Sequence, residues 1–306
     1  MAEKEIKFIG FLANVDNSIM KINFGSVFKM QKLSYNKSAN LLFQLTHDAS
    51  PFGIIKQLTW GLGYYDNEKP RYCVTSSLKD NLKFNENDSV TEWPKKLMPF
   101  HNQHVEKGLK QKLRLMRLFY DCNICMPFTY YYVDDEGVVK PIMGGGSEFF
   151  LGSDAKYTIS RGQRQKLQDF IDNTSFPFSN KNLQLAFENF EVSYKVSNRA
   201  LSFLSLMISL ETMLNPGHAE LRYHVSRNTA VLLGNKETES EKIFRDVKGL
   251  YDKRSKLVHT GNSKEITKDD LLKLRKYVRE SIVKFYEFCG DKDALCSALN
   301  KRGFGT

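Results

Sequence analysis

The hydrophobic period of residues 160–290 is the feature that most constrains the fold of this 306-residue chain. Apolar residues recur there at spacings of three and four, the period of an amphipathic helix. The clearest stripe consists of Val196, Ala200, Phe203, Met207, Leu210 and Leu214. We therefore expect one long helix over 181–214, preceded by a short helix over 161–173.

Helix-end signals divide the remainder of this half. A helix over 218–233 is expected to stop at Gly234, and a third is expected to run from "ETESEK" to His259. The last begins at Thr267, where Asp270, three residues later, is typical of a capping box. These signals predict a helical bundle.

Residues 1–155 have a different sequence pattern, in which short β-prone runs alternate with turn-forming residues. The runs are "IKFIGFLANV", "NLLFQLTH", "RYCVTSSL" and "FTYYYVDDEGVVKPI". One helical stretch interrupts them near 103–120, and "GGGSEFFLGSD" at 144–154 is predicted to be a connector. The chain is therefore predicted to be α+β, with a mixed N-terminal domain over 1–155 and an all-α bundle over 156–306.

Charge and composition narrow the class of partner. The net charge of +10 and the pI of about 9.2 favour an anionic partner such as nucleic acid, although a merely basic soluble surface would look the same. No apolar run approaches the roughly 18 residues of a membrane-spanning helix, and the first residues lack a signal-peptide core. We expect a cytoplasmic protein that does not bind a membrane. Five cysteines, an odd number, argue against a disulfide framework.

Arg254 interrupts an apolar stripe. The stripe runs through Ile243, Val247, Leu250 and Leu257. A guanidinium cannot lose its charge, so Arg254 must face a carboxylate, a subunit interface or an anionic ligand. Glu211, one turn after Met207, is the candidate carboxylate, and Arg222 and Arg227 are competitors for it.

His259 lies five residues after Arg254, in the last turn of the same predicted helix. Helix carbonyls there favour the imidazolium, which suits proton transfer near neutral pH, and Ser255 shares the face of His259. The Arg254 and His259 side chains are about 140° apart around the helix. Two copies facing each other across a two-fold axis could bring both pairs into one cleft. The alternative is a structural Arg–Glu pair with a histidine that only caps the helix.

The surrounding sequence carries a family resemblance. "SLMISLETMLNPGHAELRYHVSRNTAVLLG" (205–234), followed by "IFRDVKGLYDKRSKLVHTG", resembles the HEPN superfamily and, within it, the Apea-like HEPN branch. The family's Arg–polar–x3–His motif matches Arg254, Ser255 and His259. The resemblance covers about residues 181–290.

The resemblance implies a helical bundle that forms a homodimer and cleaves RNA without a metal or other cofactor. Many such proteins are toxins or abortive-infection effectors in antiphage defence. It implies that His259 is the acid/base for attack of a 2′-hydroxyl on the adjacent phosphate and that Arg254 holds that phosphate. Ser255 would occupy the polar position, and Glu211 would match the glutamate that steadies the site. An antitoxin or a trigger protein is a further partner to expect.

Basic residues near the motif are candidate contacts for the RNA backbone. They are Lys248, Lys253, Lys256, Arg222 and Arg227. A solvated basic face is the alternative. Two other functions stay open: a non-catalytic HEPN module that dimerises and binds RNA or protein, and a metal-dependent nuclease that uses the N-terminal half.

Other chemistry-bearing residues form weaker patterns. Cys122 and Cys125 lack the second ligand pair of a zinc site, His101 and His104 lack an obvious third ligand, and "GGGS" at 144–147 lacks the P-loop lysine. We expect structural or surface roles for them. A set of aromatic residues is open to base stacking but is more typical of a core. These residues are Trp60, Tyr64, Tyr65 and Tyr130–Tyr132.

Overall fold

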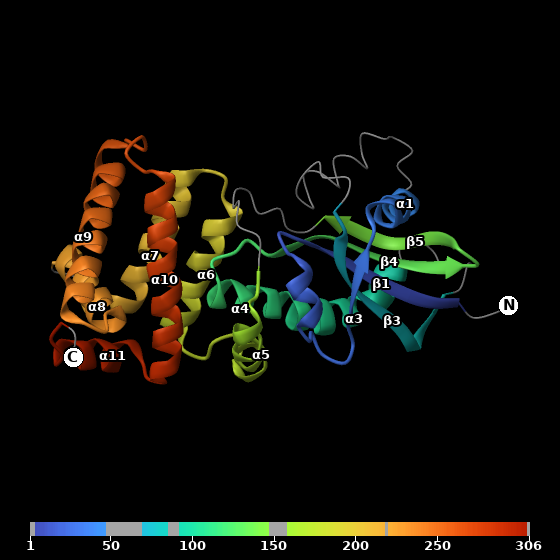
Figure 1. Ribbon diagram of the computed structural model, residues 1–306, viewed down its shortest axis with the longest axis horizontal. Coiled ribbons are helices and arrows are strands. Elements are labelled where there is room, and N and C mark those ends of the chain that lie inside the picture. The colour runs from blue at the N-terminus through green and yellow to red at the C-terminus, as the bar shows by residue number, and fades with distance from the viewer. Residues whose placement is uncertain (1–3, 47–68, 85–91, 147–157, 218–219, 305–306) are drawn as a thin grey trace. The chain divides into compact units, whose positions relative to one another are not determined.

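The computed structural model describes residues 4–46, 69–84, 92–146, 158–217 and 220–304. The chain divides into two compact units, Met1–Thr174 and Ser175–Thr306, which are described separately below (Figure 1). The division lies later in the chain than the boundary predicted near residue 155. The reason is that α5 (Arg164–Asn173) buries Leu167 and Ile171 in the core of the first unit.

The first unit contains an antiparallel sheet that has the order β2-β3-β1-β4-β5 among the described residues. Its strands are β1 (Lys4–Ala13), β2 (Lys29–Leu33), β3 (Arg71–Phe84), β4 (Cys125–Asp135) and β5 (Val138–Gly146). The predicted "DDEG" turn joins β4 to β5. There Gly137 has a φ of 89°, and its amide donates to Asp134 Oδ1 at 3.1 Å. Glycine adopts such a φ without strain, which is why the hairpin reverses here.

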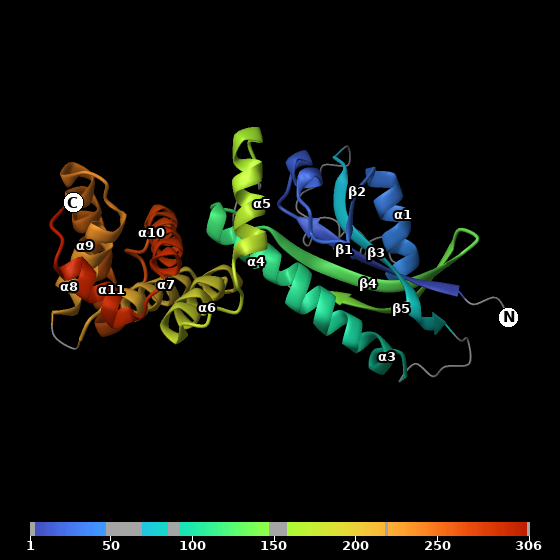
Figure 2. The ribbon, with the colours of Figure 1, turned by 90° about the horizontal axis from the view of Figure 1, so that it is seen from below.

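Helices cover both faces of this sheet (Figure 2). A continuous helical segment packs on one face, and α1 (Tyr35–Thr46) packs on the other. The segment comprises α3 (Glu92–Phe100), the π-helical η3 (His101–Lys110) and α4 (Gln111–Phe119). Phe8 faces the core under the segment and Ile9 faces the core under α1, because successive strand residues point to opposite faces. The described part of the unit also contains two short 3-10 helices, η1 (Asn17–Lys21) and η4 (Arg161–Gln163).

The β prediction for "NLLFQLTH" is wrong, because this run belongs to helix α1. Leu42 and Leu45, three residues apart, point together into the core, and the Ser34 hydroxyl accepts from the Lys37 amide at the start of the helix. The spacing of these leucines fits a helix as well as a strand, and a short apolar run does not separate the two.

Glu106, in η3, is the centre of a polar network that is partly buried. His101 Nε2 lies 3.1 Å from Glu106 Oε1, and Lys110 Nζ donates to the same oxygen at 2.7 Å. The Tyr131 hydroxyl lies 2.9 Å from His101 Nδ1. The hydrogen bond from His101, together with Lys110, lowers the pKa of Glu106 to about 2. The network ties η3 to strand β4.

Replacing Glu106 by glutamine is expected to destabilise the first unit at pH 7 and to have little effect near pH 2. The depressed pKa means that the carboxylate stabilises the fold above about pH 4.5 and loses this effect as the pH falls toward 2. The shift would correspond to about 3 kcal/mol. Because the Glu106 side chain is 42% exposed, solvent screening reduces the expected change to about 1 kcal/mol.

Urea unfolding followed by tryptophan fluorescence measures this change. Both tryptophans of the chain precede residue 175, and Trp93 is buried in the first unit, so the signal reports that unit. The exposed Glu5→Gln variant is the control and should match the wild type. A destabilisation by Glu106→Gln that is as large at pH 2 as at pH 7 would contradict the electrostatic cause.

The second unit is all-helical in its described part, as the hydrophobic period predicted. Its helices are α6 (Lys181–Lys195), α7 (Arg199–Leu214), α8 (Leu221–Leu233), α9 (Glu237–Thr260), α10 (Lys268–Phe288) and α11 (Lys292–Asn300). Helix α7 packs against all five of the others and buries Phe203, Leu206, Met207 and Leu210 completely. The predicted ends of α9 and α10 are confirmed: Gly261 ends α9 in a left-handed conformation, and Thr267 and Asp270 form a capping box.

The prediction of one helix over 181–214 is wrong at its middle. Helix α6 ends before Val196, which is extended, and α7 begins after Asn198. The Asn198 side chain accepts hydrogen bonds from the amides of Ala200 and Leu201, so it caps a new helix. Helix α11 was not predicted, although Asp291 caps it in the same way. Among the described residues, no helix has the length and apolarity needed to span a membrane.

Candidate active site

Helix α9 carries the Arg–x4–His motif at its C-terminal end. One face of α9 is buried through Ile243, Val247, Leu250, Tyr251 and Leu257. Arg254 continues that face, yet its side chain remains 27% exposed. The stripe therefore brings the arginine to the border between the bundle core and solvent.

Arg254 is held by two neighbours. Its Nε lies 3.5 Å from Glu211 Oε1 on α7, which is the pair that the spacing predicted. Its guanidinium carbon lies 5.5 Å from the centre of the Tyr251 ring, one turn earlier on α9. Glu211 Oε1 is buried, and its ion pair with Arg254 offsets the negative charge there. The guanidinium is thus held by two neighbours while part of the Arg254 side chain stays exposed.

Tyr251 is a site residue that the sequence reasoning missed. Burial, and secondly the negative charge of Glu211, raise the pKa of the Tyr251 hydroxyl, so the ring stays neutral at pH 7. A neutral, electron-rich ring beside a guanidinium stabilises the cation. The contact could have been predicted from the sequence, because Tyr251 and Arg254 are three residues apart and such residues are neighbours on a helix.

His259 is exposed in the last turn of α9, and Ser255 is half-buried one turn before it. Within the described part of the chain, no hydrogen bond or ion pair connects the His259 imidazole to Arg254 or to any other side chain. The structure therefore joins Arg254 to Glu211 but leaves His259 separate. This separation agrees with the angle of about 140° between positions five residues apart on a helix.

Two of the predicted RNA-binding lysines have acidic partners. Lys253 Nζ donates to Asp270 at 2.6 Å, and Lys256 Nζ donates to Glu265 at 3.2 Å. These pairs reduce the positive charge near the motif. The partners differ in exposure: Lys256 and Glu265 are 62% and 42% exposed, so an incoming phosphate would meet little resistance from that pair.

The two arginines of α8 and Lys248 have separate surroundings. Arg222 pairs with Asp252 at 2.7 Å, and the Lys248 ammonium lies 5.7 Å from the centre of a phenylalanine ring. Arg227 donates to the carbonyl oxygens of Leu299, at 3.1 Å, and Arg302, at 2.7 Å. Arg227 thus neutralises the C-terminal end of α11, and we leave it out of the RNA-facing set.

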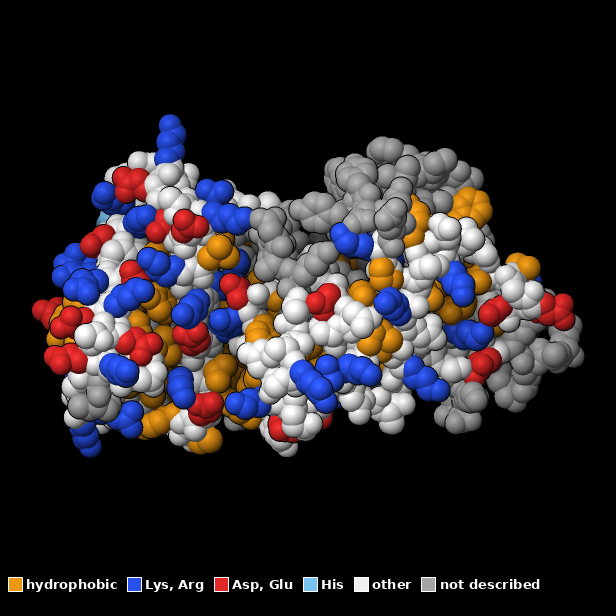
Figure 3. Space-filling model, viewed as in Figure 1, with side chains coloured by type: hydrophobic (Ala, Val, Ile, Leu, Met, Phe, Trp, Pro, Cys, Tyr) orange, Lys and Arg blue, Asp and Glu red, His pale blue; other side chains and the backbone are white. Residues whose placement is uncertain are grey.

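Charge on the second unit is mixed rather than gathered into one basic patch. Figure 3 shows Lys and Arg side chains interspersed with Asp and Glu over the helical unit on the face drawn. A phosphate chain would meet alternating signs on this face. Specific recognition would therefore depend on a few positioned cations such as Arg254 rather than on the overall field.

The weaker candidates have structural surroundings. Cys122 and Cys125 are buried, and no group of three or more His, Cys, Asp or Glu suited to a metal occurs among the described residues. His101 belongs to the Glu106 network, and His104 packs on the ring of Phe100 at 4.9 Å.

The aromatic candidates divide in two. Residues Tyr130–Tyr132 are buried in the two cores of the first unit, as the packing alternative predicted. Trp60, Tyr64 and Tyr65 lie outside the described residues. The predicted connector begins inside β5, whose last residues are Gly144–Gly146, and the rest of it also lies outside the described residues.

Comparison of the chain with family models, with curated proteins and with solved structures finds no match. The geometry of Arg254, Glu211, Tyr251 and His259, together with the motif, is therefore the basis for a functional proposal.

Proposed function

We propose that the second unit is a metal-independent endoribonuclease of the HEPN type that acts as a homodimer. The main observation in support of the proposal is the position of the Arg254 side chain and the contacts that hold it. Glu211 and the Tyr251 ring hold its guanidinium at the border of the core, 27% of the side chain stays exposed, and His259 on the same helix is also exposed.

The chemistry follows from the two side chains. A neutral His259 takes the proton of an RNA 2′-hydroxyl, and the 2′-oxygen attacks the adjacent phosphorus. The bond from phosphorus to the 5′-oxygen breaks, and that oxygen takes a proton from an imidazolium. Arg254 stabilises the negative charge that develops on the phosphoryl oxygens. The products are a 2′,3′-cyclic phosphate and a 5′-hydroxyl, and DNA is not a substrate because it lacks the attacking group.

A homodimer supplies what one copy lacks. Arg254 and His259 point in different directions on α9, so a single chain does not converge them on one phosphate. Two apolar side chains near the site are exposed: Ile208, one turn before Glu211 on α7, is 44% exposed, and Val258, next to His259 on α9, is 52% exposed. Burying such residues between two copies would stabilise a dimer and bring one copy's His259 toward the other's Arg254.

The proposed setting is that of a cytoplasmic toxin or an antiphage abortive-infection effector. An enzyme that cuts RNA without a cofactor is active whenever it is folded, so a cell needs a means to restrain it. An antitoxin or a trigger protein is the corresponding partner, and the motif on α9 is the surface that such a partner would have to cover or release.

A second candidate is a non-catalytic module that dimerises and binds RNA or protein. The observation in its favour is the absence, among the described residues, of any group that orients the His259 ring. The ion pair with Glu211 also partly neutralises Arg254. This candidate predicts RNA binding without cleavage.

Cleavage of total RNA in excess EDTA separates the two candidates. The nuclease is expected to fragment RNA but not single-stranded DNA, and the His259→Ala variant is expected to be at least about 100-fold slower because it lacks the acid/base. Binding of RNA with no fragments from either protein would favour the non-catalytic module. Cleavage that EDTA abolishes would point to a metal-dependent nuclease and contradict the proposal.

A further inference from the structure

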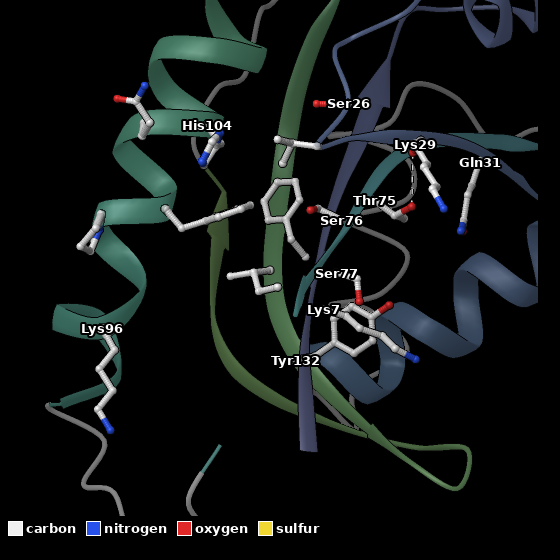
Figure 4. Close-up of a pocket in the computed structure, with 16 residues that line it drawn as sticks. Lys7, Ser26, Lys29, Gln31, Thr75, Ser76, Ser77, Lys96, His104 and Tyr132 are labelled. Carbon is white, nitrogen blue, oxygen red and sulfur yellow. Dashed lines mark hydrogen bonds between the residues drawn. The ribbon is translucent and has the colours of Figure 1, made fainter. Parts of the chain in front are cut away.

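The first unit contains a large open groove beside an exposed edge of its sheet. Strand β2 pairs with β3 only between Thr75 and Arg71, opposite Lys29–Leu33, whereas β3 continues to Phe84. Past Thr75, this edge of β3 has no partner strand among the described residues. The space between the edge and helix α3 is a groove of about 1140 Å³ (Figure 4).

Cationic and hydroxyl side chains dominate the polar lining of the groove. Lys96 and His104 lie on the α3-covered side of the sheet edge, whereas Lys7 and Lys29 extend from the side that α1 covers, so the groove wraps around the edge (Figure 4). The hydroxyls come mainly from β3, where Thr75, Ser76 and Ser77 are consecutive. None of the described lining residues is an aspartate or a glutamate. Such a lining favours an anionic ligand.

Two of these groups have no competing partner. Within the described part of the chain, neither the Lys29 ammonium nor the His104 imidazole makes a hydrogen bond or an ion pair. Lys7 differs, because its ammonium donates to Asp134 at 3.0 Å and is 36% exposed. That pair holds Lys7 at the rim, and a phosphate could share the ammonium without breaking it.

The shape and the aromatic content of the groove indicate a strand of nucleic acid rather than a small anion. A nucleotide occupies roughly 300 Å³, the lower end of ordinary ligand pockets, so the groove has room for about three. The cations lie on both sides of the sheet edge and are not gathered around one point, which suits an extended ligand that passes around the edge. The Phe100 and His104 rings, 4.9 Å apart on the helical wall, offer a face on which a base can stack.

We propose that this groove binds single-stranded RNA, with Lys29 and Lys96 contacting phosphates and the Phe100–His104 pair stacking on a base. The inference goes beyond the proposed nuclease, because it assigns an RNA-binding site to the first unit whether or not the second unit cleaves. It gives the first unit a role: to hold RNA independently of the Arg254 site.

Charge reversal tests the groove with a matched control. All proteins are full-length and carry His259→Ala, so that the probe, a fluorescein-labelled decauridylate, stays intact. Lys29→Glu with Lys96→Glu reverses two groove lysines. Lys37→Glu with Lys95→Glu reverses two exposed lysines of the same unit that do not line the groove, with the same change in net charge. Fluorescence anisotropy measures affinity between 50 and 200 mM salt, and circular dichroism confirms folding.

The groove variant is expected to bind RNA at least about 10-fold more weakly at 100 mM salt. A plot of log affinity against log salt concentration should also become less steep by about 1.4, because each of the two lost phosphate contacts with a single strand contributes about 0.7 to the slope. The control should stay within about two-fold of its parent. Cross-linking of a 4-thiouridine oligomer should label residues 96–104.

Three results would overturn the inference. They are an equal loss of affinity in both variants, no loss in either, and cross-links confined to the second unit. Displacement of the RNA by poly-L-glutamate at equal charge concentration would instead assign the groove to an acidic polypeptide. If the groove variant binds RNA as tightly as its parent while the wild-type enzyme cleaves RNA, only the groove proposal is refuted. If the groove variant binds RNA more weakly but the wild-type enzyme does not cleave RNA, only the nuclease proposal is refuted.

Discussion

Replacing Arg254 by alanine is expected to lower the rate of RNA cleavage by about 10²–10³-fold, the usual effect of removing one donor that stabilises a transition-state charge. In the structure the guanidinium is held by Glu211, 3.5 Å away, and by the Tyr251 ring. A cation positioned before the reaction does not have to be ordered as charge develops on the phosphate. Single-turnover cleavage of a defined RNA measures the effect on the chemical step.

Two variants control for charge and for folding. Arg254→Lys keeps the charge but loses the planar, forked donors, so an intermediate rate is expected. Lys242→Ala removes an exposed cation of the same helix that is not among the candidate RNA contacts, and it should change the rate by no more than about three-fold. A folded Arg254→Ala protein that cleaves at the wild-type rate would remove Arg254 from the proposed mechanism. Circular dichroism identifies a variant that is merely unfolded.

Replacing Arg275 by alanine is expected to destabilise the second unit by about 3 kcal/mol. This arginine of α10 is only 5% exposed, and its guanidinium donates to the Ser193 carbonyl oxygen at 3.1 Å. The guanidinium carbon also lies 4.2 Å from the centre of the Tyr194 ring. A buried hydrogen bond from a charged group contributes about 1.5–3 kcal/mol, and the desolvated cation–π contact adds about 2 kcal/mol, part of which is offset by the desolvation of the charge.

Urea unfolding followed by far-UV circular dichroism reads this change, because both tryptophans of the chain belong to the other unit. Lys276→Ala, which alters the exposed neighbour on the same helix, should shift stability by less than about 0.5 kcal/mol. If Arg275→Ala were no more destabilising than Lys276→Ala, the contacts of Arg275 would not hold α10 to α6.

The hydrophobic period was sufficient to predict the all-helical second unit, since its helices bury continuous apolar stripes. The hydrophobic period gave wrong helix boundaries where a polar side chain caps a new helix. Asn198 ends the apparent 181–214 helix by offering its side chain to the amides of a new one, and Asp291 starts α11 in the same way. Both residues were visible as capping types, but the choice between a cap and an exposed helical position depends on tertiary packing.

The predicted Arg254–Glu211 pair is present because two helical stripes, each read from sequence, meet where Arg254 and Glu211 interrupt them. The groove of the first unit was not predictable in the same way. Lys29 and Lys96 are far apart in the sequence, and the pairing of β2 with β3 and the packing of α3 on the sheet bring them to the lining of one groove. The hydrophobic periodicity of a sequence predicts single helices and strands, and it does not show which residues from distant parts of the chain come together.

The most direct test of the nuclease proposal is the chemistry of the fragment ends. Purified wild-type and His259→Ala proteins are incubated with total RNA in excess EDTA, and the new termini are identified by mass spectrometry. We expect 2′,3′-cyclic phosphates and 5′-hydroxyls from the wild type and none above background from His259→Ala. Fragments with 5′-phosphates, or fragments that His259→Ala produces equally well, would contradict the proposal that His259 and Arg254 cleave RNA through its own 2′-hydroxyl.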